Sequence, residues 1–253
     1  MSDKILAQAP GDDCYRTVQH SGEPKGRVEK IGDIDTYIAT PPTGTASIPA
    51  KGIILFYADV YGPLYINNKL LQDHFAEHGY IVLGIDYFLG DPVYVHLEEE
   101  GFDRSAWGAK SREQAREHVP TWLEAVRERF GKDAKYAAVG YCFGAPYVLE
   151  TGAESEMTAA AIAHPAYLTE AHFKDNNAPL FLSCAEIDQT FGLEFRRRAE
   201  DILIEGKKTY HFQVFSGIRH GFAIRGDPAV ENERWAKEES ARSIVGWFNR
   251  FIK

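Results

Sequence analysis

The chain has 253 residues, of which 44% are hydrophobic and 26% are charged, and its formal charge at pH 7 is −9. This composition is that of an ordinary globular protein, and the length is compatible with a single domain. The acidic balance and the lack of a basic run argue against a nucleic-acid partner, because such binding depends on Lys and Arg that neutralise phosphates, and against anionic membranes for the same reason.

The three cysteines, Cys14, Cys142 and Cys184, lie far apart and form no C-x-x-C pair. Neither a disulfide framework nor a zinc knuckle is therefore predicted, and a reducing compartment fits best. The N-terminal residues carry too short an apolar patch for a signal-peptide core, and no apolar run approaches the roughly 20 residues of a membrane helix. We expect a cytoplasmic protein.

Strands and helices are expected to alternate after a polar leader at residues 1–30. Apolar runs or alternation predict strands at 35–39, 52–58, 80–85, 135–139, 159–163, 179–184 and 209–215. Apolar residues on one face predict helices at 67–77, 110–130, 193–204 and 229–251. Pro120 is expected to kink or restart the second of these helices. Residues 41–49 are expected to form a loop, and residues 87–108 a long loop or lid. The alternation implies a mostly parallel central sheet with helices on both faces.

The most informative motif is Gly140-Tyr-Cys-Phe-Gly144, directly after a predicted strand. Its Gly-x-nucleophile-x-Gly spacing is that of the nucleophile elbow of α/β-hydrolases. The two glycines permit a tight turn, and the strained central residue, Cys142, is presented above the sheet. The N-terminus of the next helix favours a thiolate and then an oxyanion. The alternative is a small buried cysteine in a glycine-rich turn.

Two later residues complete a candidate triad. In an α/β-hydrolase the acid and the histidine follow the nucleophile in that order, each at the carboxyl end of a strand. Asp188 and His220 meet this expectation, and Glu186 is the weaker rival for the acid because it lies nearer to the strand. Cys184 is expected to be a core residue, and Cys14 to be incidental.

The predicted chemistry is nucleophilic acyl transfer. His220 takes the thiol proton of Cys142, and Asp188 holds the imidazole in the productive tautomer. The backbone N–H groups of Phe143 and Val60 are expected to bind the oxyanion. Water then resolves the thioester.

Taken together, the motifs resemble the dienelactone hydrolase family, and in particular its eukaryotic, fungal-type members. The resemblance spans nearly the whole chain and is carried by segments 26–32, 59–62, 140–144 and 220–222. It implies an α/β-hydrolase fold, no cofactor, no metal, a Cys-Asp-His triad and the opening of an enol-lactone. In the family a glutamate holds the resting thiol until substrate arrives. Asp59, one methylene shorter, stands at that position and is predicted to gate the thiol.

The substrate contacts depart from the bacterial pattern of two arginines that bind the substrate carboxylate. The first is absent here and the second is displaced to Arg225, which is predicted to contact an anion. Aromatic side chains are predicted to line the pocket and to suit a flat or apolar acyl group. The predicted contacts are Tyr61, Tyr87, Phe88, Trp107, His164, Phe222 and Arg225. A structural role for His164 is the alternative.

Two other functions stay open at this point. One is a lyase, isomerase or cyclase reaction of secondary metabolism on the same scaffold. The other is a thiol redox sensor or a binding protein with a vestigial triad. The expected partner is a small-molecule ester or lactone, and the sequence is compatible with a monomer or a homodimer.

Overall fold

The eight strands described in the computed structural model, which covers residues 3–42, 50–153 and 157–253, form one sheet in the order β1-β2-β4-β3-β5-β6-β7-β8. The strands are β1 (Arg27–Ile31), β2 (Ile34–Ala39), β3 (Ile53–Tyr57), β4 (Ile81–Ile85), β5 (Tyr136–Tyr141), β6 (Met157–Ala163), β7 (Leu180–Ile187) and β8 (Tyr210–Arg219). β2 is antiparallel to β1 and to β4, and all other neighbours pair in parallel. The predicted, mostly parallel sheet is confirmed.

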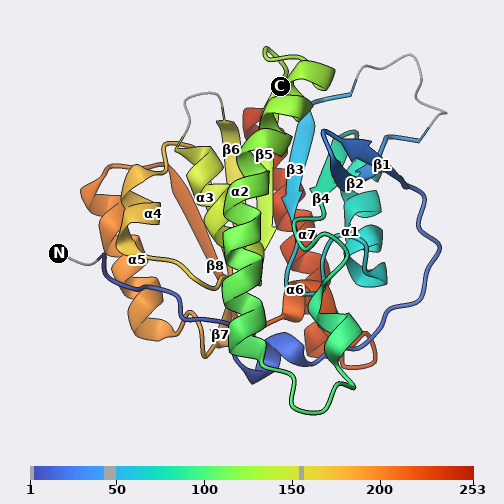
Figure 1. Cartoon of the computed structure of the whole chain (residues 1–253). Coiled ribbons are helices and arrows are strands. Elements are labelled where there is room, and N and C mark those ends of the chain that lie inside the picture. Colours follow the sequence, from blue (N-terminus) through green and yellow to red (C-terminus); the bar gives the residue numbers. More distant parts are fainter. Residues whose placement is uncertain (1–2, 43–49, 154–156) are drawn as a thin grey trace.

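Helices cover both faces of this sheet (Figure 1). The α-helices are α1 (Ile66–Glu77), α2 (Arg104–Phe130), α3 (Ala145–Gly152), α4 (Glu170–Asp175), α5 (Leu193–Glu205), α6 (Phe222–Arg225) and α7 (Glu231–Phe251). Short 3-10 helices are η1 (Asp12–Tyr15), η3 (Val93–His96) and η4 (Cys142–Gly144). One core lies between the sheet and α2, α3, α4 and α5, and a second core lies between the sheet and α1, α6 and α7.

The central strands are apolar throughout because both of their faces are covered. In β3, Leu55 and Tyr57 point into the first core, whereas Ile54 and Phe56 point into the second. This alternation is the two-residue period of a strand, and coverage on both sides makes every position apolar. The parallel order brings the carboxyl ends of β3, β5, β6, β7 and β8 to one edge, where a site can form.

Three predictions about the elements need correction. The end of the polar leader is an edge strand, β1, because Arg27–Ile31 pairs with β2 and leaves charged side chains in solvent. α2 begins at Arg104 and continues through Pro120 without restarting; this proline is exposed, so its ring faces solvent. The loop expected at 87–108 therefore ends earlier and contains η3. Most of the loop expected at 41–49 lies outside the described residues.

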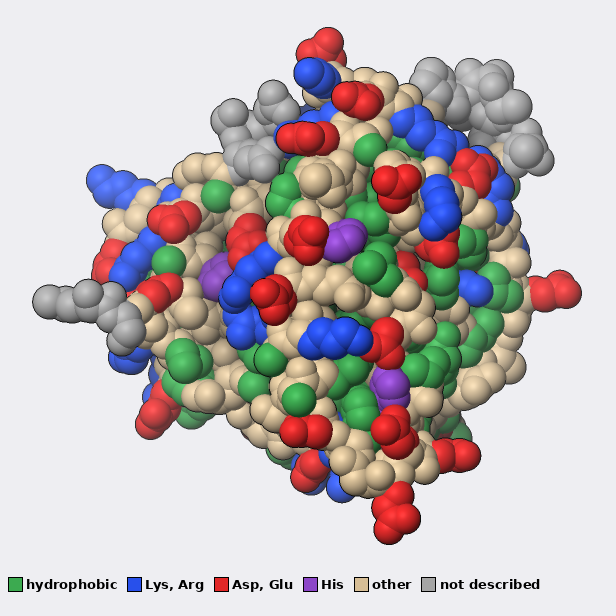
Figure 2. All heavy atoms as spheres, viewed as in Figure 1, with side chains coloured by type: hydrophobic (Ala, Val, Ile, Leu, Met, Phe, Trp, Pro, Cys, Tyr) green, Lys and Arg blue, Asp and Glu red, His purple; other side chains and the backbone are tan. Residues whose placement is uncertain are grey.

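The surface over α2 carries both signs of charge. Figure 2 shows Asp and Glu side chains intermixed with Lys and Arg across this face. None of the described helices combines the length and the apolar character that a crossing of a lipid bilayer requires.

Candidate active site

Cys142 lies in a sharp turn between β5 and α3. Its φ angle of +48° is rare for a residue with a side chain and places it in the left-handed region. A Cβ on Gly140 would lie 2.7 Å from the Gly144 carbonyl oxygen, and one on Gly144 would lie 2.2 Å from the Tyr57 carbonyl oxygen. Only glycine fits at either position, so the two glycines of the motif produce the expected elbow.

The structure brings His220 and Asp188 together at the same edge of the sheet. Asp188 follows β7 and His220 follows β8, and Nδ1 of His220 lies 3.0 Å from Oδ1 of Asp188. Glu186 instead accepts hydrogen bonds from the backbone N–H of Gly217 and the hydroxyl of Ser216 at the surface. Asp188, and not its rival, is therefore the histidine's carboxylate partner.

Asp188 is fixed as an anion by several donors. Its Oδ1 accepts hydrogen bonds from the backbone N–H groups of Thr190 and Phe191 at 2.8 and 3.0 Å, and from the Thr190 hydroxyl at 2.7 Å. Burial opposes the charge, but His220 and these hydrogen bonds outweigh it and hold the pKa of Asp188 at about 2. The carboxylate is thus a permanent negative charge behind the imidazole.

The Cys142 sulfur has a hydrogen-bond partner, Cys14, that was expected to be incidental. Cys14, on η1 in the leader, places its Sγ 3.5 Å from Sγ of Cys142, within hydrogen-bond distance for sulfur. These two sulfurs and one ring nitrogen of His220 all lie within 4.8 Å of one another, and all three residues are buried. The prediction for Cys14 is wrong: the leader contributes a thiol to the site.

The three groups share protons unequally. Burial opposes ionisation of Cys14, but the hydrogen bond from Cys142 and the neighbouring His220 outweigh it and hold the pKa of the Cys14 thiol well below its ordinary value. Burial and the adjacent Cys14 raise the pKa of Cys142 well above its ordinary value. Burial lowers the pKa of His220, but the charges of Cys14 and Asp188 outweigh it and raise that pKa to about 10. At rest the imidazolium therefore pairs with Cys14, and Cys142 is a neutral thiol.

Two thiols and an imidazole are donors that also suit a zinc ion. Within the ranges that the structure describes, Cys14, Cys142 and His220 form the one cluster of His, Cys, Asp or Glu with metal-ligand spacing. A closed structural site has four protein ligands, whereas an open catalytic site has three, and three are present here. The hydrogen bond between the two thiols and the His220–Asp188 pair account for the cluster without an ion.

The part of the leader that precedes β1, residues 3–26, covers this cluster. It runs beneath the carboxyl ends of the strands in Figure 1. Backbone hydrogen bonds join Leu6 to Leu168 and Gln8 to Thr190, at 2.8 and 2.9 Å. Beyond Cys14, the carbonyl oxygen of Tyr15 accepts a hydrogen bond from the Tyr61 hydroxyl at 3.0 Å. Cys142 is fully buried under this cover.

Asp59 and Arg225, which were predicted to gate the thiol and to contact an anion, form a buried ion pair with each other. Oδ1 of Asp59 also accepts hydrogen bonds from the Tyr61 backbone N–H at 3.1 Å and from Nδ2 of Asn68 at 3.0 Å. Arg225 donates to the carbonyl oxygen of Arg16 in the leader at 2.9 Å. Both charges are thus occupied in the resting structure, and their predicted roles stay predictions.

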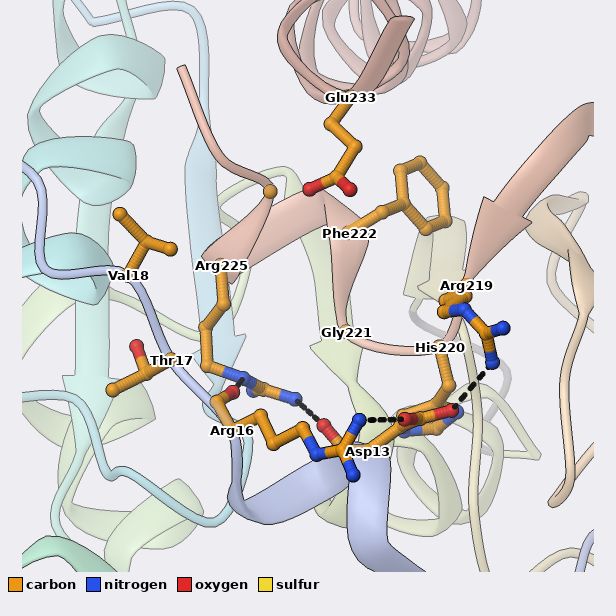
Figure 3. Close-up of a pocket in the computed structure, with 11 residues that line it drawn as sticks. Asp13, Arg16, Thr17, Val18, Arg219, His220, Gly221, Phe222, Arg225 and Glu233 are labelled. Carbon is orange, nitrogen blue, oxygen red and sulfur yellow. Dashed lines mark hydrogen bonds and ion pairs between the residues drawn. The ribbon is translucent and has the colours of Figure 1, made fainter. Parts of the chain in front are cut away.

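A pocket of about 190 Å³ opens between the leader and α6 and reaches His220 (Figure 3). Phe222 and Arg225, both predicted as substrate contacts, line it together with leader residues such as Asp13 and Val18. The Asp13 carboxylate lies between Arg16 and Arg219, at 3.8 and 4.0 Å.

The remaining aromatic residues lie in the core next to the elbow. Tyr61, Tyr87, Phe88 and Trp107 are at most 5% exposed. Three of their rings pack against Phe143, with centroid distances of 5.4, 5.0 and 6.5 Å for Tyr87, Phe88 and Trp107. They hold the elbow in place, and direct substrate contact stays a prediction.

His164 packs against His220. Its ring is fully buried and meets the His220 ring edge to face, with centroids 4.9 Å apart. Its φ angle of +36° is unusual for a side-chain-bearing residue. Burial, with the charge of His220, lowers the pKa of His164 well below its ordinary value, so it is neutral. This position favours the structural alternative, in which it buttresses His220.

The two predicted oxyanion donors lie at equivalent positions just after two adjacent strands, β3 and β5. Tyr57 of β3 pairs with Gly140 of β5, so Val60 and Phe143 each follow their paired residue by three positions. The Phe143 N–H interacts with the Cys142 sulfur and favours its thiolate. Oxyanion binding by these N–H groups stays a prediction.

The sheet order, the elbow and the histidine–carboxylate pair at the carboxyl edge define an α/β-hydrolase fold. The putative dienelactone hydrolase of Klebsiella pneumoniae subsp. pneumoniae MGH 78578 has this fold, with a TM-score of 0.70 and 16% identity over 89% of this chain and 98% of that one. Residues 34–252 match the model of the dienelactone hydrolase family, and the chain belongs to this family.

Fungal relatives are similar along their whole length. Dienlactone hydrolase 1 of Gibberella moniliformis is 35% identical over 100% of this chain and 98% of its own. Hydrolase tropI of Talaromyces stipitatus is 32% identical over 98% of this chain and 99% of its own. The resemblance predicted from the sequence is therefore confirmed.

Proposed function

We propose that this protein hydrolyses a lactone or another carboxylic ester, with Cys142 as the nucleophile. The observation that carries the proposal is the juxtaposition of a thiol on a strained elbow with a buried imidazole that is paired to a carboxylate anion. Membership of the dienelactone hydrolase family supports the same class of reaction.

Substrate entry requires the leader to shift, because Cys142 is fully buried beneath it. The pocket at the edge of the leader reaches His220 and offers the path of entry. When Cys14 moves away, it takes back the proton from the imidazolium and leaves as a neutral thiol. His220 is then a neutral base, and Cys142 is the thiol beside it.

The reaction then proceeds in two displacements. The Cys142 sulfur attacks the carbonyl carbon while its proton passes to His220, and the Phe143 and Val60 N–H groups bind the oxyanion. The carbon–oxygen bond of the ester breaks, and the leaving alkoxide takes the proton from His220. Water, deprotonated by the same imidazole, attacks the thioester and releases the carboxylic acid. Asp188 keeps the ring oriented throughout.

The test compares hydrolysis of small lactones, thioesters and p-nitrophenyl esters by the parent protein and by Cys142→Ala. We expect a loss of about 10³-fold or more in kcat/KM, as for other triads that lose their nucleophile. Cys184→Ala is the matched control, since it removes another buried thiol from within β7. Mass spectrometry of acid-quenched turnover should find the acyl group on Cys142.

The lyase, isomerase or cyclase reaction, with His220 as a base, would be favoured by a different result. In that case Cys142→Ala would reduce turnover, but no acyl adduct would form on Cys142. Equal activity of the parent and Cys142→Ala on every substrate would refute the catalytic proposal altogether.

A further inference from the structure

We propose that Cys14 and Cys142 are a modification site: a peroxide oxidises the pair to a disulfide that ties the leader to the elbow. The two residues are separated by 128 positions in the chain, yet their sulfur atoms lie 3.5 Å apart. Both side chains are buried in the same cluster with His220. The proposal does not depend on the hydrolytic reaction, because it concerns the chemistry of the two thiols alone.

The geometry requires only a small movement. A disulfide bond is about 2.05 Å long, so the sulfurs must approach by roughly 1.5 Å. Cys142 is held by the elbow and its glycines, whereas Cys14 is on the four-residue helix η1. η1 belongs to the leader, which is attached by hydrogen bonds and not by strand pairing at this point. The leader is therefore the part that moves.

Placement beside His220 also makes Cys14 the more reactive thiol. The neighbouring imidazolium and the hydrogen bond from Cys142 hold the pKa of Cys14 low despite its burial, and the thiolate is the form that attacks an oxidant. A peroxide small enough to reach this buried cluster, such as hydrogen peroxide, is the class of oxidant that fits. The pocket beside His220 provides its access.

The reaction balances in two steps. The Cys14 thiolate attacks one peroxide oxygen, the O–O bond breaks, and the departing hydroxide takes a proton from His220 to become water. Cys14 is then a sulfenic acid. The Cys142 sulfur attacks the Cys14 sulfur, the S–O bond breaks, and the departing hydroxide takes the Cys142 proton as a second water. Two thiols are oxidised by two electrons in total, and one hydrogen peroxide is reduced to two waters.

The disulfide would have two effects. It removes the free thiol of Cys142, the proposed nucleophile, and it holds the leader closed over the site by a covalent bond. Cys184 provides an internal comparison, because it is equally buried but burial raises its pKa far above the ordinary value. It should stay reduced under conditions that oxidise the pair.

The experiment treats the reduced, full-length protein with one equivalent of hydrogen peroxide in the presence of a metal chelator. Intact mass should fall by the mass of two hydrogen atoms, and free thiols should fall from three, the cysteine content of the chain, to one. Peptide mapping should recover a Cys14–Cys142 cross-link, and dithiothreitol should restore both thiols. Cys184→Ala should behave like the parent in losing two hydrogens.

Cys14→Ala and Cys142→Ala should not lose two hydrogens, and Cys14→Ser serves if the alanine variant does not fold. Limited proteolysis within the leader should be slower in the oxidised parent than in the reduced parent, but unchanged by peroxide in Cys14→Ala. Oxygen addition at Cys142 with Cys14 still free, or a loss of two hydrogens in Cys14→Ala, would overturn the proposal. None of these readouts uses a substrate, so a failure here is distinct from a failure of the proposed hydrolysis.

Discussion

The elbow and the leader meet at one pair of sulfur atoms, but they are held in place by different physics. The elbow is fixed by backbone geometry, since Gly140 and Gly144 are packed so closely that no side chain fits. The leader is held by contacts with distant parts of the chain: Leu6 and Cys14 are buried in the core, and the carbonyl oxygens of Tyr15 and Arg16 accept hydrogen bonds. One region is therefore fixed by its own backbone, and the other is held by separable contacts between segments far apart in the chain. A site built from both can be preorganised and covered at the same time.

The largest expected effect comes from the carboxylate that pairs with His220. Asp188→Asn keeps the shape of the side chain but removes the charge that fixes the His220 tautomer. We expect kcat to fall by about 10⁴-fold, as in other triads. Steady-state kinetics on the best ester substrate measures this change. Glu186→Gln is the matched control, because that carboxylate is exposed and does not contact His220. Equal losses in the two variants would contradict the assignment of the acid.

The close packing of the elbow predicts a large cost in stability. Gly144→Ala would bring a Cβ to 2.2 Å from the Tyr57 carbonyl oxygen, so the β3–β5 edge must move. We expect a loss of about 3 kcal/mol in the free energy of unfolding, measured in urea. Gly246→Ala in α7 is the control: its Cβ would meet no atom within 4 Å, and alanine favours the helix interior. A Gly144→Ala variant as stable as the parent would show that the elbow is not tightly fixed.

The loss of stability at low pH tests the ion pair between Asp188 and His220. The folded-state pKa of Asp188, about 2, lies below the unfolded value near 3.9. Its contribution is therefore present above about pH 4 and is lost as pH falls towards 2, and it amounts to about 3 kcal/mol. Urea unfolding between pH 5 and pH 2 should show this slope in the parent and a smaller slope in Asp188→Asn. Identical slopes would mean that the pair does not stabilise the fold.

The same contrast explains what the sequence could predict. The elbow is a local pattern in which five consecutive residues specify the turn, so Cys142 was recognisable, and the chain order of Asp188 and His220 follows from strands that end at one edge. Cys14 was not recognisable, because its partner is 128 positions away and no periodicity marks the leader as a cover. The pairing of Asp59 with Arg225 was missed for the same reason. Long-range contacts of irregular segments have no local signature.

The smallest expected effect tests the leader alone. Tyr61→Phe removes the hydroxyl that donates to the Tyr15 carbonyl oxygen while leaving the ring in place. The closed state of the leader should become about 1 kcal/mol less stable relative to the open state. Amide hydrogen exchange around η1 should therefore accelerate about fivefold, while the free energy of global unfolding changes little. Tyr80→Phe is the matched control, since its hydroxyl donates to Asn249 and not to the leader. If exchange near η1 rises equally in both variants, the leader is not held independently of the fold, and the division into a rigid elbow and an opening cover does not hold.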